Sequence, residues 1–479
     1  MKTQPSIALA GSPSVWRAAA TVAVAVPIGL AIAMTAEPLV IVAIALVATG
    51  AAAYTMAGSD TARRSLLLSA LAVSFVMTGR RMDTSFIVLE PWLVLFPICL
   101  LMWAGEIVVT RRVVPLDRIG FFALLVVVAA WLSYFGALDV MTWLKRAMKV
   151  TWLFGLYLLM VNWASGERQL RALIRAGLWG CAGAGVAIIV QMTVRWASQG
   201  YGEVFGAAGT FANSNEAATF LAIFVVMGLA LYASGRHQAI MHRRALLFLI
   251  GTCLMGILFS RSRTGLLSST AVSALLFART PRVRRLVLAS FVVILILAVT
   301  PSTAVLLNRL LGSVGLSGDA EFDDFMRGGD IGRLYLVQLY WTVIKAHPIF
   351  GVGAANYGFI GDLQLAFPQP PAEVGIVSAD SYLGLSSHNG FINWWLETGT
   401  PGIVVFVASL VCAMAMVWLA RRNPRGDPFW RAVATGTVGG LAVFVLTNMS
   451  GEFGVSEVRY WLLLALASIS ARQLKTRPA

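Results

Sequence analysis

Long apolar stretches recur along almost the whole chain, and they are the feature that most limits what it can fold into. A stretch of roughly 16–20 apolar residues is long enough to cross a bilayer as a helix. Such stretches begin near residue 18 and the last ends near residue 471. Charged residues make up 12% of the chain and hydrophobic residues 58%, whereas a soluble domain is about a quarter charged. We therefore expect an all-α fold, a polytopic transmembrane helical bundle of about 12–14 spans. The candidate spans lie near 18–34, 38–57, 65–78, 84–103, 119–138, 148–164, 173–194, 216–234, 245–259, 265–279, 286–303, 401–420, 432–448 and 458–471.

The net charge of +15 fits a membrane protein whose Arg and Lys residues gather in cytoplasmic loops. With the N-terminus inside, the basic loops that follow alternate spans all fall in the cytoplasm, as does the C-terminal tail. The first apolar stretch lacks a clear cleavage site, so it is expected to be a retained helix. Nucleic-acid binding is not expected, because no soluble basic domain exists to carry it.

This topology divides the chain into three predicted parts. Residues 1–303 form a transmembrane bundle with a cytoplasmic N-terminus, and residues 400–479 form C-terminal transmembrane helices with a cytoplasmic end. Between them, residues 304–399 are the one long hydrophilic segment and lie outside as a periplasmic loop subdomain. Residues 331–347 of this segment have helical character, and Pro348 ends that helix.

Several basic residues face outward in this topology, against the usual bias. A few such violations can be tolerated, or the side chains can reach anionic headgroups. Taken together they predict a basic cavity at the outer membrane surface, suited to an anionic lipid-linked substrate, because the planar guanidinium of Arg binds phosphate oxygens in pairs. The residues are Arg80, Arg81, Lys145, Arg146, Lys149, Arg195, Arg261 and Arg263.

No metal or cofactor is predicted. The acidic residues between Asp319 and Asp330 match no calcium-loop spacing and are expected to form a solvated loop. The four cysteines lie inside apolar stretches without a C-x-x-C pair, which indicates neither a disulfide framework nor a zinc site. The glycines of "GVGAANYG" fit neither a dinucleotide-binding nor a P-loop spacing.

Four segments in one order are more specific than any of them alone. They are "GTFANSNEAATFLA" at 209–222, "SRTG" at 262–265, "GR…W…KAHPIFGVGAANYG" ending at 358, and "SHNGFINWWLETGTPG" at 387–402. In this order and spacing the chain resembles the O-antigen ligase and O-antigen polymerase family, strongly over about residues 209–420. The N-terminal half shares with that family only its hydrophobic character.

The resemblance implies an inverting, metal-independent transfer of a glycan from an undecaprenyl-diphosphate carrier to a sugar hydroxyl on the periplasmic side. Such a reaction needs a base near the hydroxyl and cations near the departing diphosphate. The family histidine falls on His388, the expected general base; the alternative is an interfacial histidine facing headgroups. Arg333 and Arg263 are expected to bind the diphosphate, with Arg263 favoured over its neighbour Arg261. His347 is expected to complement a helix dipole instead.

Weaker candidates for substrate contacts complete the predicted site. Asn389 can orient the loop or the substrate, and Glu397 can equally be a structural partner for an Arg. Asn213 and Asn215 can line the cavity, although capping a helix that starts near Glu216 explains Asn215 equally well. Trp394 and Trp395 fit an interfacial aromatic belt. The remaining candidates are Arg80, Arg81 and Arg146.

The acceptor stays open at this stage. A ligase would transfer the finished glycan to a lipid A–core acceptor. A polymerase would transfer the growing chain to another lipid-linked repeat unit, and a protein O-oligosaccharyltransferase would glycosylate protein. A lipid-linked glycan flippase is the alternative from another class, but no internal repeat supports it. A dolichyl-type transferase is weakly indicated, because the first external loop offers only Glu37. Membrane lipids and a chain-length regulator or other polysaccharide-assembly protein are further candidate partners, and the bacterial inner membrane is the expected location.

Overall fold

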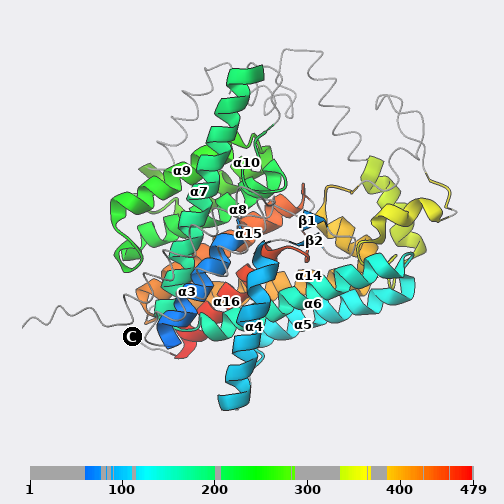
Figure 1. The fold of residues 1–479 in the computed structure, drawn as a ribbon, viewed down its shortest axis with the longest axis horizontal. Helices are drawn as coiled ribbons and strands as arrows, with labels where there is room; N and C mark the ends of the chain where they lie inside the picture. Colours follow the sequence, from blue (N-terminus) through cyan, green and yellow to red (C-terminus); the bar gives the residue numbers. More distant parts are fainter. Residues whose placement is uncertain are drawn as a thin grey trace, which may run out of the picture.

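The computed structural model describes residues 60–76, 82–83, 88–89, 91–110, 115–199, 206–281, 283–285, 335–363, 365–367, 386–423, 425–451 and 454–476. Within these ranges the chain is built almost entirely of helices (Figure 1). Three predicted spans, 18–34, 38–57 and 286–303, lie outside the described residues, as do Arg80, Arg81, Arg333 and the acidic residues 319–330.

The elements follow one another as α3 (Asp60–Ser74), β1 (Met82–Asp83), β2 (Val88–Leu89), α4 (Pro91–Thr110), α5 (Arg118–Leu132), η1 (Ser133–Gly136), α6 (Val140–Trp163), α7 (Glu167–Gln199), α8 (Ser214–Ala233), η2 (Arg236–Ala239), α9 (Arg243–Phe259), α10 (Arg263–Phe277), η3 (Asn356–Asp362), α14 (Gly390–Arg421), α15 (Pro428–Asn448) and α16 (Val458–Thr476). Residues 335–346 form a further helix before η3. The two short strands pair antiparallel, with Met82 opposite Leu89.

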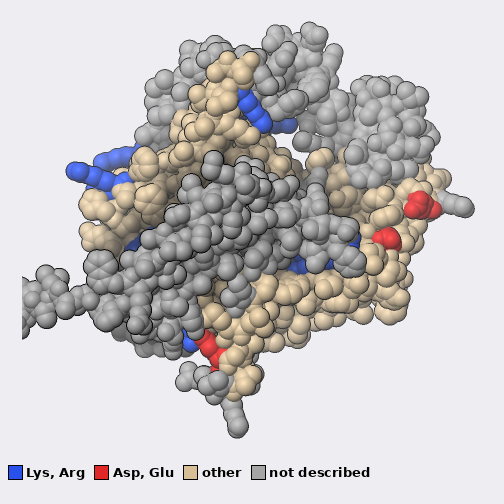
Figure 2. All heavy atoms as spheres, viewed as in Figure 1, with Lys and Arg blue, Asp and Glu red and all other residues tan. Residues whose placement is uncertain are grey.

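The all-α polytopic fold class is confirmed. Five of the described helices are long and apolar enough to cross a membrane, and shorter apolar helices run over Arg64–Ser74 and Leu95–Val108. The five are Arg118–Gly136, Glu167–Ser198, Ser214–Ala233, Gly390–Arg421 and Pro428–Asn448. The surface over α5 and α6 carries almost no charged side chains in Figure 2, as expected of a face turned toward lipid.

Helix α8 lies at the centre of the bundle and is almost completely buried. It packs against α15, α9 and α10. Two glycines of α15 permit the closest approach, because a β-carbon on Gly436 or Gly439 would collide with Met227 or Val226 of α8. Small residues at helix contacts are the usual way for membrane helices to pack closely.

The starts of α6 and α4 differ from the predicted ones. The span expected at 148–164 belongs to α6, which begins at Val140, so Lys145, Arg146 and Lys149 lie in a helix and not in a loop. Asp139 caps this helix by accepting a hydrogen bond from the Thr142 amide at 2.7 Å, and hydrogen bonds from Thr142 hold the pKa of the Asp139 carboxyl below its usual range.

The span expected at 84–103 starts at Pro91 as α4, and the residues before it include the two strands. Pro at the first position of α4 is favourable because its missing N–H would have no partner there.

Helix α14 begins earlier than predicted and contains a kink. The segment "GFINWWLETG" was expected to be a loop before a span at 401–420, but it is helical from Gly390. Gly399 breaks the regular geometry with φ 70° and ψ −174°, and Pro401 begins the second half. The residues from Gly390 to the kink therefore form a first half-helix, which leads into the second half of α14.

A second, smaller hydrophobic core lies beside the first half of α14. It joins residues of the 335–346 helix, such as Tyr335, Leu339 and Tyr340, to Val352 and Leu396. In Figure 1 these yellow and pale-orange segments lie at the end where α5 and α6 meet. The proposed boundaries of the 304–399 subdomain stay a prediction, and α14 continues across residue 399.

Candidate functional site

The start of α14 holds His388 in an unusual backbone conformation. His388 is exposed and has φ 52°, in the left-handed region that few residues other than glycine adopt. The next residue, Asn389, caps α14 by accepting hydrogen bonds from the Phe391 and Ile392 amides at 3.0 and 3.2 Å. The side-chain oxygen of Asn389 is therefore engaged in capping, and the cap fixes the position of His388 directly before it.

The residues on either side of His388 are held in place by a buried network. Ser387 donates a hydrogen bond from its hydroxyl to the Asn393 side-chain oxygen at 2.5 Å. Asn393 in turn donates to the Ser386 hydroxyl at 3.0 Å, and the His388 amide donates to the same hydroxyl at 3.3 Å. Left-handed geometry at a non-glycine residue is unfavourable, so the surrounding hydrogen bonds must maintain it.

The turn at 347–353 is joined to the kink of α14 through main-chain groups. The Val352 amide donates to the Leu396 carbonyl at 2.9 Å, the Gly353 amide to the Glu397 carbonyl at 3.1 Å, and the Thr400 amide to the Pro348 carbonyl at 2.7 Å. Two of the four family-like segments, "PIFGVGAANYG" and "HNGFINWWLETG", thus lie against each other.

Glycine is required for this close approach. Gly351 has φ 68°, and a β-carbon there would stand 2.5 Å from the Glu397 carbonyl carbon. Only glycine adopts this conformation without strain while leaving room for the opposite backbone. The closely spaced glycines of the turn therefore serve the contact between two chain segments.

The same turn also contacts the junction between η1 and α6. Leu138 donates to the Val352 carbonyl at 3.2 Å, and the Ala354 amide donates to the Ser133 hydroxyl at 3.1 Å. Asn356, which is fully buried, accepts a hydrogen bond from the Asp139 amide at 2.5 Å. Because Asp139 caps α6, Asn356 connects the turn to the helix that carries Arg146.

The other two family-like segments meet at the starts of α8 and α10. Asn213, not Asn215, caps α8 by accepting from the Glu216 amide at 2.8 Å, so the alternative in which Asn215 caps this helix is wrong. Asn215 instead accepts a hydrogen bond from the Ser262 hydroxyl at 2.7 Å, and Ser262 caps α10. The two helix starts are thereby tied side by side.

Both predicted arginines of the "SRSRTG" segment lie at this junction. Arg263 is the first residue of α10 and is partly exposed. Arg261 has φ 54° and is only 8% exposed. Two helix N-termini at this place add their partial positive charge to that of the arginines.

A buried arginine that the sequence analysis did not single out joins α16 to this junction. Arg459 is 2% exposed; it donates to the Glu216 carbonyl at 2.9 Å and to the Glu457 carboxylate at 2.8 Å, and lies 3.5 Å from the Glu216 carboxylate. An arginine inside a predicted span is itself a signal of function or of a paired acid. The sequence contains that signal at the start of the last span.

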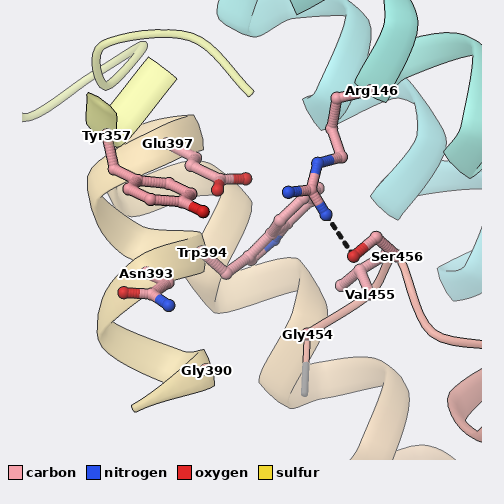
Figure 3. Close-up of a pocket in the computed structure, with 9 residues that line it drawn as sticks. All are labelled: Arg146, Tyr357, Gly390, Asn393, Trp394, Glu397, Gly454, Val455 and Ser456. Carbon is pink, nitrogen blue, oxygen red and sulfur yellow. Dashed lines mark hydrogen bonds between the residues drawn. The ribbon is translucent and has the colours of Figure 1, made fainter. Parts of the chain in front are cut away.

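A small cavity of about 50 Å³ lies between α6, α14 and the residues before α16 (Figure 3). Arg146 extends into it and donates a hydrogen bond to the Ser456 hydroxyl. Glu397, which is buried, receives a hydrogen bond from the Ala355 backbone and lies within electrostatic reach of Arg146. The volume is that of one or two water molecules. Its lining residues are Arg146, Tyr357, Gly390, Asn393, Trp394, Glu397, Gly454, Val455 and Ser456.

Two further predictions can be compared with the structure. Trp394 is buried and donates to the Gly402 carbonyl at 3.1 Å, so it does not belong to a headgroup-facing belt, which corrects that expectation. Trp395 donates to the Thr400 hydroxyl at 3.2 Å and stacks edge-on with Trp341. His347 follows the 335–346 helix, as predicted, and its amide donates to the Val343 carbonyl. No group of metal-ligating side chains occurs among the residues that the structure describes.

Comparison with known protein families gives one match. The family described as O-antigen ligase matches residues 245–407, a stretch that runs from α9 to the second half of α14. His388, Glu397, Arg261 and Arg263 lie within it. A search of curated proteins finds no match to the chain.

Proposed function

Because residues 245–407 match the family described as O-antigen ligase, we propose that the protein transfers a glycan from an undecaprenyl-diphosphate-linked donor to a sugar hydroxyl. The reaction would take place on the periplasmic face of a bacterial inner membrane during assembly of a cell-surface polysaccharide. The acceptor would be either a lipid A–core glycan or the end of another lipid-linked chain.

One observation carries this proposal beyond the family match. The segments that the sequence analysis placed outside the membrane come together at one end of the helices. The 347–353 turn pairs with α14, and α8 with α10. At the start of α16, Arg459 binds Glu216 of α8, and Ser456, just before that helix, binds Arg146 of α6. These contacts support a common site around Arg146, the cavity and the start of α14, directly after His388.

His388 is proposed as the general base. The acceptor hydroxyl oxygen would form a bond to the anomeric carbon of the donor while the bond from that carbon to the diphosphate oxygen breaks, and the hydroxyl proton would pass to the imidazole. A neutral imidazole near ambient pH is suited to accept it. The exposed, left-handed position of His388 supports this role, because such geometry is kept mainly where the surroundings or a function require it.

The arginines are proposed to stabilise the departing undecaprenyl diphosphate. Arg263 lies at the start of α10, where the helix dipole adds to its charge, and Arg261 lies beside it. Arg333 is proposed for the same role on the family resemblance. Arg146 and Glu397 are proposed to contact the acceptor or donor sugar, because both line the cavity.

The test is complementation of a strain that lacks the native protein. His388→Ala and Arg333→Ala are each expected to abolish surface polysaccharide, or reduce it at least about a hundred-fold, as loss of a general base does. His347→Ala is the matched control, because that histidine is at a helix end in the neighbouring turn. Normal long-chain glycan from either of the first two variants, at normal expression, would refute the assigned roles.

The null strain also identifies the acceptor. If carrier-linked long polymer accumulates, the missing step is ligation to lipid A–core. If single carrier-linked repeat units accumulate, the missing step is polymerisation. Unchanged polysaccharide with unglycosylated protein targets would assign protein glycosylation.

A further inference from the structure

The second half of α14 presents an apolar stripe to its surroundings. Val404, Val411 and Leu419 are each more than half exposed. Arg422 lies 18 positions after Val404, which is five helical turns and a rise of about 27 Å, so both residues are on the same side of the helix. This is close to the hydrocarbon thickness of a bilayer, roughly 30 Å. The stripe therefore has the length and composition of a surface that faces acyl chains, and an arginine lies at its end.

A basic cluster of Arg421, Arg422 and Arg425 lies where this stripe ends, at the end of α14 remote from the candidate site. The Arg421 guanidinium lies 3.6 Å from the ring centre of Trp418, and that of Arg422 lies 5.1 Å from the same ring. Neither arginine forms an ion pair with any residue in the described part of the chain. The exposed Arg425 follows, while the nearby Asp427 caps α15.

These contacts favour an anion at this position. Two guanidinium groups on one indole repel each other, and a phosphate between them would offset that repulsion through charge-assisted hydrogen bonds. Three arginines against one engaged aspartate leave a local excess of positive charge, so a headgroup with a net negative charge fits better than a zwitterionic one.

We propose that Trp418, Arg421 and Arg422 bind the headgroup of an anionic membrane phospholipid whose acyl chains lie along the Val404–Leu419 stripe. The stripe leads directly to the cluster, which favours a lipid over a soluble phosphate. The site lies at the other end of α14 from His388, so its existence does not depend on the proposed function.

The test measures lipid retention by the full-length protein. The protein is reconstituted in nanodiscs containing phosphatidylcholine and phosphatidylglycerol, transferred to mild detergent, and analysed by native mass spectrometry. The wild type is expected to retain phosphatidylglycerol in preference to phosphatidylcholine. Arg421→Ala/Arg422→Ala is expected to retain on the order of ten-fold less. Arg244→Ala is the control, because Arg244 is an exposed arginine at the start of α9.

Each outcome decides the proposal. Equal retention of the two lipids by the wild type would overturn it, and so would a double variant that keeps phosphatidylglycerol as well as the control does. Displacement of the lipid by millimolar inorganic phosphate or pyrophosphate would overturn it in favour of a soluble anion. If the double alanine variant fails to fold, two measurements still test the proposal. They are the lipid preference of the wild type and the retention of phosphatidylglycerol by Arg421→Lys/Arg422→Lys.

Discussion

Replacing Arg459 with Met should destabilise the protein strongly. Arg459 is 2% exposed and Glu216 is 4% exposed, and the arginine also binds the Glu216 carbonyl and the Glu457 carboxylate. Removing the arginine breaks this buried pair, which costs about 3–5 kcal/mol in comparable buried pairs. The side-chain volume is largely kept by Met, so the loss reports the charge and its hydrogen bonds.

A partly exposed ion pair provides the control for the general effect of removing an arginine charge on the free energy of unfolding. Arg64 pairs with Glu106 at 3.0 Å, but both side chains are about one third exposed, so Arg64→Met should cost about 1 kcal/mol or less. Equilibrium unfolding in mixed micelles with increasing SDS gives the free energy of unfolding for each variant.

A double-mutant cycle completes the measurement. Glu216→Gln removes the buried charge that Arg459→Met leaves behind, so the double variant should recover part of the loss, with a coupling of roughly 1–3 kcal/mol. If the two single losses simply add, or if Arg459→Met costs no more than Arg64→Met, the buried pair does not hold α8 to α16 as argued.

Three other outcomes are expected. Gly351→Ala should impair folding and glycan assembly, because its β-carbon would meet the backbone of α14. Gly358→Ala should be tolerated in the same complementation assay, because a β-carbon added there would have no neighbouring atom within 4 Å. Asn389→Ala should lower the free energy of unfolding by about 1 kcal/mol, and Asn389→Asp should restore it; loss of glycan with both variants would show a role beyond capping. Arg146→Ala should reduce glycan assembly without loss of folded protein, while the exposed Lys145→Ala should not; equal effects would count against the cavity as part of the site.

The helical spans could be predicted from apolar periodicity, because a membrane leaves a chain few other ways to satisfy its backbone. The start of α6 could not be predicted this way. Lys145 and Arg146 suggested a loop, although Asp139, three residues before Thr142, carries the capping signal. In "NSNE" both Asn213 and Asn215 are chemically suitable caps, and the choice depends on Ser262, whose hydroxyl engages Asn215.

Only part of the candidate site could be predicted from the sequence. His388 and the Arg261–Arg263 pair could be proposed as candidates because they lie in short segments with a recognisable order. Arg459 was missed, because its partner Glu216 lies 243 residues away and no local pattern links them. Long-range pairing of this kind appears only when the helices are placed against one another.

The pairing of the 347–353 turn with α14 has a consequence for how far the sequence of this turn can vary. The three hydrogen bonds that join them use main-chain atoms alone, so they do not depend on which side chains the turn carries outside its glycines. Ile349 is 60% exposed, whereas Phe350 is 39% exposed and its ring packs against Phe135 with centroids 5.3 Å apart. Ile349 can therefore be exchanged while the turn stays docked, so that one fixed backbone can carry different outer side chains.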